Sequence, residues 1–140
     1  MSRRTLTIII FALFAIGEIG DLFGLIVTLA SPNDAARMLG ITPRAETIRS
    51  IILIALAVLV AMNALVALAG MLIRSAFLFQ FGALMTGVGL VLYGAYQILS
   101  AVFQHGYLQF AGVGLVYAAL GALALWFARA ARSVTAKAGA

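Results

Sequence analysis

Two carboxylates, Glu18 and Asp21, lie three positions apart within an otherwise apolar stretch that reads FAIGEIGDLFG (Phe14–Gly24). Three positions are close to one helical turn, so both side chains lie on neighbouring parts of one helix surface. Two negative charges this close together in apolar surroundings repel each other and lose hydration, so we expect at least one to be neutral near pH 7. A carboxyl group that can be neutral or charged in such surroundings is what proton coupling, or the binding of a cationic ligand, requires.

Structural roles for the same pair stay open. A protonated Glu18 could hydrogen-bond to Asn63 or Tyr117 and lock the helices together, and Asp21 could pair with Arg49. Contact with another subunit is a third alternative. The residue types alone do not decide among these roles, so the surrounding elements have to be considered.

The composition places these acids in a membrane. Of the 140 residues, 65% are hydrophobic and 9% are charged, whereas about 25% of the residues in a soluble domain are charged. The net charge is +5, but the basic residues lie at the ends of apolar runs, where anionic lipid headgroups are the natural partner and nucleic acid is not. There are no cysteines, so disulfides and thiolate chemistry are excluded.

Four apolar runs are long enough to cross a hydrocarbon core of about 30 Å, which takes around 20 helical residues. They cover residues 6–30, 51–73, 76–102 and 107–128. Residues 32–39 begin with a proline and end before a glycine, which predicts a short amphipathic helix on the membrane surface. We therefore predict one membrane domain over residues 1–140, all-α, in which four transmembrane helices form an antiparallel bundle with a short amphipathic helix in the first loop.

Polar side chains recur near the middle of all four runs. Glu18, Asn63, Thr86 and Tyr117 lie at similar depth, and the third run carries a further polar stripe. This stripe either lines an outward-facing cavity or anchors aromatic side chains at the interface. The predicted ligand or proton site comprises Glu18, Asp21, Asn63, Thr86, Tyr93, Tyr96, Gln97 and Tyr117.

Small residues line the faces that we expect to pack inside the bundle. Gly20 and Gly24 are four positions apart, a spacing that lets transmembrane helices approach closely. The sequence therefore predicts that this face of the first helix packs against another helix.

The basic residues also predict orientation. With the N-terminus inside, six fall on the inner side and three on the outer side, which favours two cytoplasmic termini in a bacterial inner membrane. The six are Arg3, Arg4, Arg74, Arg129, Arg132 and Lys137, and the three are Arg37, Arg44 and Arg49.

Two resemblances bear on function. The segments AIGEIGDLFGL, which contains Glu18, and GVGLVLYG resemble small multidrug resistance transporters. These transporters have four short helices and one membrane-embedded glutamate in the first helix. The segments LASPNDAARMLGI and QHG, together with Arg49 at the start of the second helix, resemble uncharacterised bacterial four-helix membrane families. The first resemblance implies that Glu18 is the coupling acid of a transporter, and the second implies no activity.

Two functions are therefore expected as alternatives. The first is a proton-coupled transporter or binder of a small hydrophobic or cationic compound, with Glu18 as the coupling acid. The second is a non-catalytic accessory or assembly subunit of a larger membrane complex, with the carboxylates holding helices together. The lipid bilayer is a partner in both, and a homo-oligomer is compatible with either. No enzymatic activity, metal or cofactor is expected, and no nucleic acid.

Overall fold

The structure is a computed structural model that describes residues 1–103 and 108–136. All of its regular elements in these ranges are helices. They are α1 (Arg3–Ala30), α2 (Pro32–Leu39), α3 (Pro43–Leu72), α4 (Ala76–Phe103), α5 (Leu108–Arg129) and α6 (Ala131–Thr135). The predicted third loop at 104–106, the predicted start of the fourth run at 107 and Lys137 lie outside the described residues.

Four of these helices are long and apolar enough to cross a membrane, as the sequence predicts. The qualifying segments are Arg3–Ala30, Pro43–Leu72, Ala76–Val102 and Phe110–Arg129. The all-helical class and the four apolar spans are therefore confirmed.

The second span begins at Pro43, eight residues before the predicted position 51. Thr42 caps it, because its hydroxyl oxygen accepts a hydrogen bond from the backbone N–H of Ala45 at 3.2 Å. Pro43 follows in the first turn, where a missing N–H costs nothing. As a result Glu46 and Arg49 lie within the helix and not in a loop.

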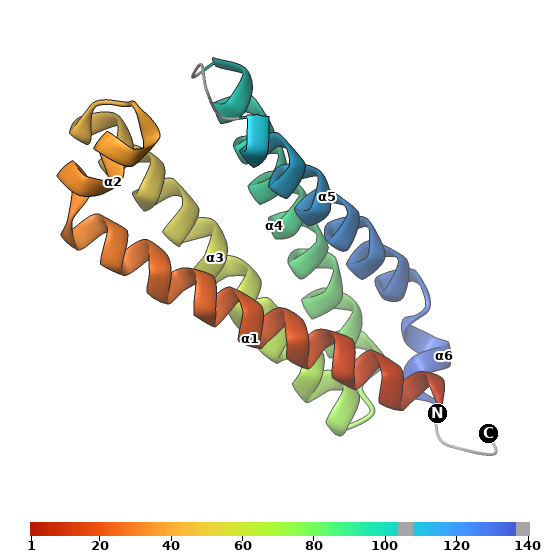
Figure 1. The fold of residues 1–140 in the computed structure, drawn as a ribbon. Helices are drawn as coiled ribbons and strands as arrows, with labels where there is room; N and C mark the ends of the chain where they lie inside the picture. Colours follow the sequence, from red (N-terminus) through yellow and green to blue (C-terminus); the bar gives the residue numbers. More distant parts are fainter. Residues whose placement is uncertain (104–107, 137–140) are drawn as a thin grey trace.

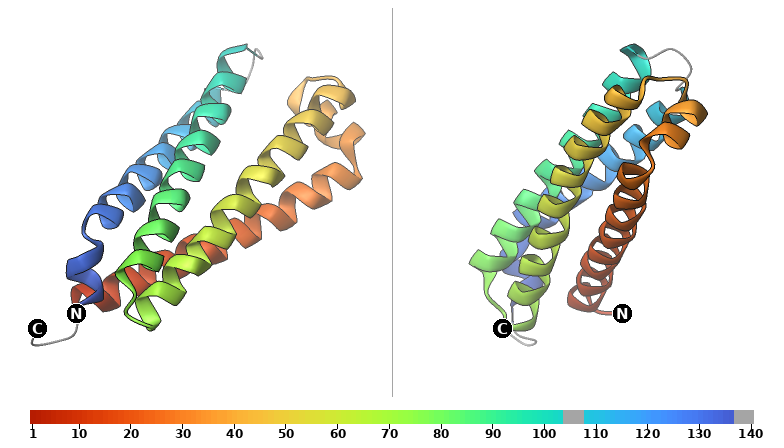
Figure 2. Two further views of the ribbon diagram at one scale, coloured as in Figure 1. Left: turned by 180° about the vertical axis from the view of Figure 1, so that it is seen from behind. Right: turned by 90° about the vertical axis from the view of Figure 1, so that its left-hand side faces the viewer.

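The four long helices pack in chain order: α1 on α3, α3 on α4, and α4 on α5. The N-terminus and the last described helix, α6, lie at one end of the molecule, and α2 lies at the other (Figures 1 and 2). At the end with the N-terminus and α6, Phe11 of α1 contacts Phe14, Phe79 and Phe127 edge to face, with ring centroids 5.3–6.0 Å apart. This aromatic cluster joins α1, α4 and α5. Toward α2 the ribbons of α1 and α3 spread away from those of α4 and α5 (Figure 1).

Close helix approach occurs at glycines of α3, α4 and α5, and not at the predicted glycines of α1. A methyl group added at Gly82 of α4 would lie 2.7 Å from the carbonyl oxygen of Asn63 on α3. A methyl group added at Gly94 of α4 would lie 2.8 Å from the backbone nitrogen of Ala118 on α5. By contrast, nothing lies within 4 Å of a methyl group added at Gly17, Gly20 or Gly24. The prediction that Gly20 and Gly24 pack against another helix is therefore wrong within this chain, because α1 buries its phenylalanine face instead.

The connection between α3 and α4 is the three-residue segment Ile73–Ser75. Arg74 has a φ of 58°, in the left-handed region that side chains other than glycine rarely adopt. Its guanidinium donates a hydrogen bond to the carbonyl oxygen of Ala136 at 3.0 Å. The sharp reversal is thus held in place by the segment that follows α6.

Candidate functional site

The side chains of α1, α4 and α5 meet at Asp21. The hydroxyl of Tyr117 on α5 donates a hydrogen bond to the Asp21 carboxylate on α1. The ring of Tyr93 on α4 stacks on that of Tyr117, with centroids 4.5 Å apart and planes 27° apart. Three predicted site residues, separated widely in sequence, therefore form one continuous group.

Glu18 lies beside this group and is only 4% exposed. Its Oε2 atom is buried and has no hydrogen-bond partner among the described residues. Glu18, Asp21 and Arg49 are all close enough to the Tyr93 hydroxyl to act on it electrostatically. A buried acceptor without a partner is costly to maintain, so Glu18 is the residue in this cluster that most needs a proton or a ligand.

The two hydrogen-bond partners predicted for Glu18 are wrong. Tyr117 bonds to Asp21 instead. Asn63 donates to the Leu59 carbonyl oxygen one turn earlier on its own helix, at 2.8 Å. The side-chain amide of Asn63 thus satisfies its own helix and does not reach across to α1.

The remaining predicted residues lie on α4. Thr86 is fully buried, and its hydroxyl has no described hydrogen-bond partner. Tyr96 is partly buried and packs against the apolar cluster formed by Leu53, Ala57 and Tyr93. Thr86 therefore offers a second unpartnered polar atom inside the molecule, whereas Tyr96 acts chiefly through packing.

A second polar cluster joins α3 to α4 at the end that carries α2. The Arg49 guanidinium contacts Oε1 of Glu46 at 3.4 Å and Oε1 of Gln97 at 3.3 Å. The Ser50 hydroxyl donates to the same Glu46 oxygen at 3.2 Å. The Arg49 guanidinium also lies 5.1 Å from the ring centroid of Phe110 on α5, a cation–π distance. Arg49 thus pairs with Glu46, so the predicted Asp21–Arg49 pair is wrong.

Glu46 is the functional candidate that sequence reasoning missed. It is 0% exposed, and its Oε2 atom has no hydrogen-bond partner in the described part of the chain. The signal was present: Thr42-Pro43 is a helix-start pattern, and a helix from that point puts Glu46, Arg49 and Ser50 at i, i+3 and i+4 on one face.

Tyr93 and Gln97 connect the two clusters. They lie one helical turn apart on α4: the Tyr93 ring stacks on Tyr117, and the Gln97 side-chain oxygen accepts a hydrogen bond from Arg49. Polar groups therefore follow one another from Glu18 and Asp21, through Tyr117, Tyr93 and Gln97, to Arg49 and Glu46. We call this series the polar track.

Within residues 1–103 and 108–136, no three His, Cys, Asp or Glu side chains gather closely enough to hold a metal. His105 lies outside those ranges. No family model, curated protein or solved structure matches the chain. Its function has to be argued from the polar track itself.

Proposed function

We propose that this chain is a membrane protein that binds a small cationic or hydrophobic compound in competition with protons, with Glu18 as the coupling acid. The observation that carries the proposal is the buried Glu18 carboxyl, which has an unpartnered oxygen next to a second acid. A proton on Glu18 removes the cost of its charge at that depth, and a bound cation compensates it equally well. Proton and cation would therefore displace each other.

The neighbours of Glu18 suit such a ligand. The stacked rings of Tyr93 and Tyr117 offer aromatic faces, which attract cations and accept apolar groups. Asp21 is held by Tyr117, so its charge is partly compensated and it modulates Glu18. The ligand class follows from this mixture of one uncompensated acid with aromatic and aliphatic surroundings.

The polar track extends the proposed site toward the end of the molecule that carries α2. Acids inside membrane proteins mark proton pathways. Here the acids Glu18 and Asp21 lie at one end of the track and Glu46 at the other, with Gln97 and Arg49, which take up no proton themselves, between them. Glu46, with its own unpartnered oxygen, would be the last acid before the surface.

The test is the substitution Glu18→Gln. Glutamine has the shape of the protonated acid, so the fold is retained, whereas exchange with protons is lost. We expect binding of tetraphenylphosphonium, a lipophilic cation, to strengthen with rising pH in the wild type over roughly pH 5–9, and to be weak and independent of pH in the variant. Isothermal calorimetry and proton release in weakly buffered detergent solution measure both effects.

Asp34→Asn is the matched control, because Asp34 is an exposed acid on α2 and does not belong to the polar track. It should bind like the wild type at every pH. Identical pH profiles for the wild type and Glu18→Gln would rule out coupling through Glu18.

A second candidate function is an accessory subunit of a larger membrane complex or a homo-oligomer. The observation that favours it is the exposed glycine face of α1, formed by Gly17, Gly20 and Gly24. Faces of small residues allow another transmembrane helix to approach closely. In that case the carboxylates stabilise the fold, and Glu18→Gln leaves the behaviour of the complex unchanged.

The proposed setting is a bacterial inner membrane, with the four spans as an antiparallel bundle and α2 on the outer surface. The N-terminus and α6 lie at one end of the molecule (Figure 1), as two cytoplasmic termini require. The side chains of Met38 and Leu39, which a surface position of α2 would place against the lipid, lie outside those described.

We expect a reporter fused to the C-terminus to report a cytoplasmic location, and one inserted after Gly40 a periplasmic location. The reason is the six-to-three bias of basic residues toward the end with the termini. Alkaline phosphatase and green fluorescent protein fusions measure the two locations. A periplasmic C-terminus would overturn this orientation.

A further inference from the structure

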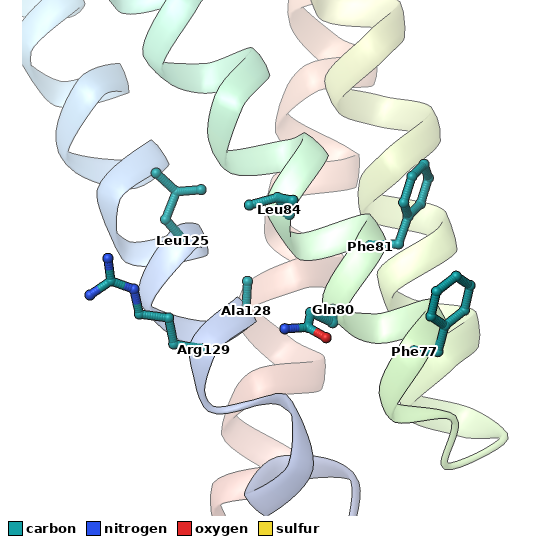
Figure 3. A pocket seen from close by; sticks show the side chains of 7 residues that line it. All are labelled: Phe77, Gln80, Phe81, Leu84, Leu125, Ala128 and Arg129. Atoms are coloured by element: carbon teal, nitrogen blue, oxygen red, sulfur yellow. The ribbon is translucent and has the colours of Figure 1, made fainter.

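A groove runs between α4 and α5 at the end of the molecule that carries the N-terminus and α6 (Figure 3). It encloses about 340 Å³, within the roughly 300–1,000 Å³ of small-molecule sites. Away from Gln80 and Arg129, it is lined by the apolar side chains Phe81, Leu84 and Leu125. This part of the groove has the surface that a hydrocarbon chain requires.

The outer part of the groove is polar. Gln80 lies in the second turn of α4, and Arg129 is the last residue of α5. Figure 3 shows Gln80 reaching toward α5, and the Arg129 side chain extending outward from the end of α5 on the side away from Gln80. Arg129 is exposed and bonds to no carboxylate or carbonyl oxygen of the described residues. An amide donor and an uncompensated guanidinium therefore stand where the apolar surface ends.

The same end of the molecule carries basic residues and no acid. The four acids of the chain are Glu18, Asp21, Asp34 and Glu46. They lie in the middle of α1, on α2 and near the start of α3, away from this end. Arg4 and Arg74 donate to the carbonyl oxygens of Met71 and Ala136, which leaves their charge uncompensated as well. The positive potential around Arg129 is thus complementary to an anion.

We propose that this groove binds an anionic phospholipid, with its phosphate at Arg129 and Gln80 and one acyl chain along Phe81, Leu84 and Leu125. An acyl chain attached to a phosphate combines the two surfaces of the groove at the right depth, since one helical turn separates Gln80 from Leu84. An anionic headgroup is preferred over a zwitterionic one because each basic residue near the membrane surface attracts negative lipid. This site lies apart from Glu18 and does not depend on the function proposed above.

The experiment places a fluorescent reporter in the groove. Phe77 lines it and is 75% exposed, and Trp126 is the chain's single tryptophan. The double substitution Trp126→Phe with Phe77→Trp therefore moves the one indole into the groove. The protein is reconstituted into phosphatidylcholine vesicles that contain an equal small fraction of brominated phosphatidylglycerol or of brominated phosphatidylcholine. Bromine quenches the indole where the lipid binds.

We expect the brominated anionic lipid to quench with at least fivefold higher affinity than the zwitterionic one. Arg129→Gln in the reporter protein should lower that preference about fivefold, which corresponds to the roughly 1 kcal/mol that one basic residue contributes near a membrane surface. Gln80→Leu should lower it by a smaller factor, because it removes a neutral donor.

Two matched controls separate a site from a diffuse positive field. Arg132→Gln removes an exposed charge at the same end but outside the groove, and Arg44→Gln removes one at the start of α3. Arg44→Gln should retain the preference of the reporter protein, and Arg132→Gln should lower it less than Arg129→Gln does. If Arg132→Gln and Arg129→Gln lower the preference for anionic lipid equally, the preference comes from the general positive charge of this end and not from a site in the groove. Equal quenching by the two lipids before any charge is removed would overturn the proposal and leave the groove to neutral hydrocarbon or to another protein.

Discussion

Replacing Arg49 by leucine should lower the free energy of unfolding by about 3–5 kcal/mol, because it strands a buried carboxylate. Glu46 is 0% exposed, and Arg49 is the basic residue that contacts it. The substitution also removes the bond to Gln97. Unfolding in detergent, followed by circular dichroism with increasing denaturant, measures the loss. Arg44→Leu, on the exposed side of the same helix start, should change stability little.

The double substitution Glu46→Leu with Arg49→Leu should recover most of that loss. A buried ion pair replaced as a whole by apolar side chains costs little, because the desolvation of both charges is removed along with their attraction. A double variant as unstable as Arg49→Leu alone would show that the pair contributes by geometry and not by charge compensation. If Arg49→Leu itself has wild-type stability, the buried contacts of Arg49 with Glu46 and Gln97 do not stabilise the fold.

Gly94→Leu should destabilise the protein by about 3 kcal/mol or more, at the upper end of the range for overpacking. Gly94 and Gly114 face each other across α4 and α5: a methyl group at Gly114 would lie 2.6 Å from the carbonyl oxygen of Gly94. Backbone atoms cannot yield as the far end of a side chain can, so the two helices must separate. Thermal unfolding in detergent measures the effect.

Gly24→Leu is the matched substitution on α1, and it should leave the stability of the isolated chain unchanged. No atom lies within 4 Å of a methyl group at Gly24. A large loss of stability at Gly24 with none at Gly94 would mean that the helices are paired differently. If Gly24→Leu disrupts an oligomer isolated from native membranes but not the single chain, the glycine face of α1 is where a further helix binds.

The four spans could be predicted from the sequence, because the length and apolarity of a span are local properties. The sequence also placed Asp21, Tyr93 and Tyr117 in one predicted site, and the structure joins these three. What it could not supply is the rotation of each helix about its axis. On α1 the glycine face and the phenylalanine face are both plausible inner faces, and the choice depends on Phe79 and Phe127, which come from distant parts of the chain.

The missed contact of Glu46 has a different cause. Its partners Arg49 and Ser50 are local and could have been found once the helix was extended back to Thr42. The contact with Gln97 is not local, because it depends on how α3 and α4 are placed along each other. The glycines that allow this close placement, Gly70 and Gly82, have no partner that sequence spacing alone identifies.

The three-residue connection between α3 and α4 constrains how the protein is made. Three residues reach at most about 11 Å, about a third of a hydrocarbon core of roughly 30 Å. The adjoining ends of α3 and α4 therefore emerge on the same side of the membrane, and the two spans must be inserted together as a helical hairpin. Arg74 is the only charged residue in that connection. Under the proposed orientation, Arg74 adds to the basic bias that keeps this connection on the cytoplasmic side, and the direction of α5 follows from that of the hairpin.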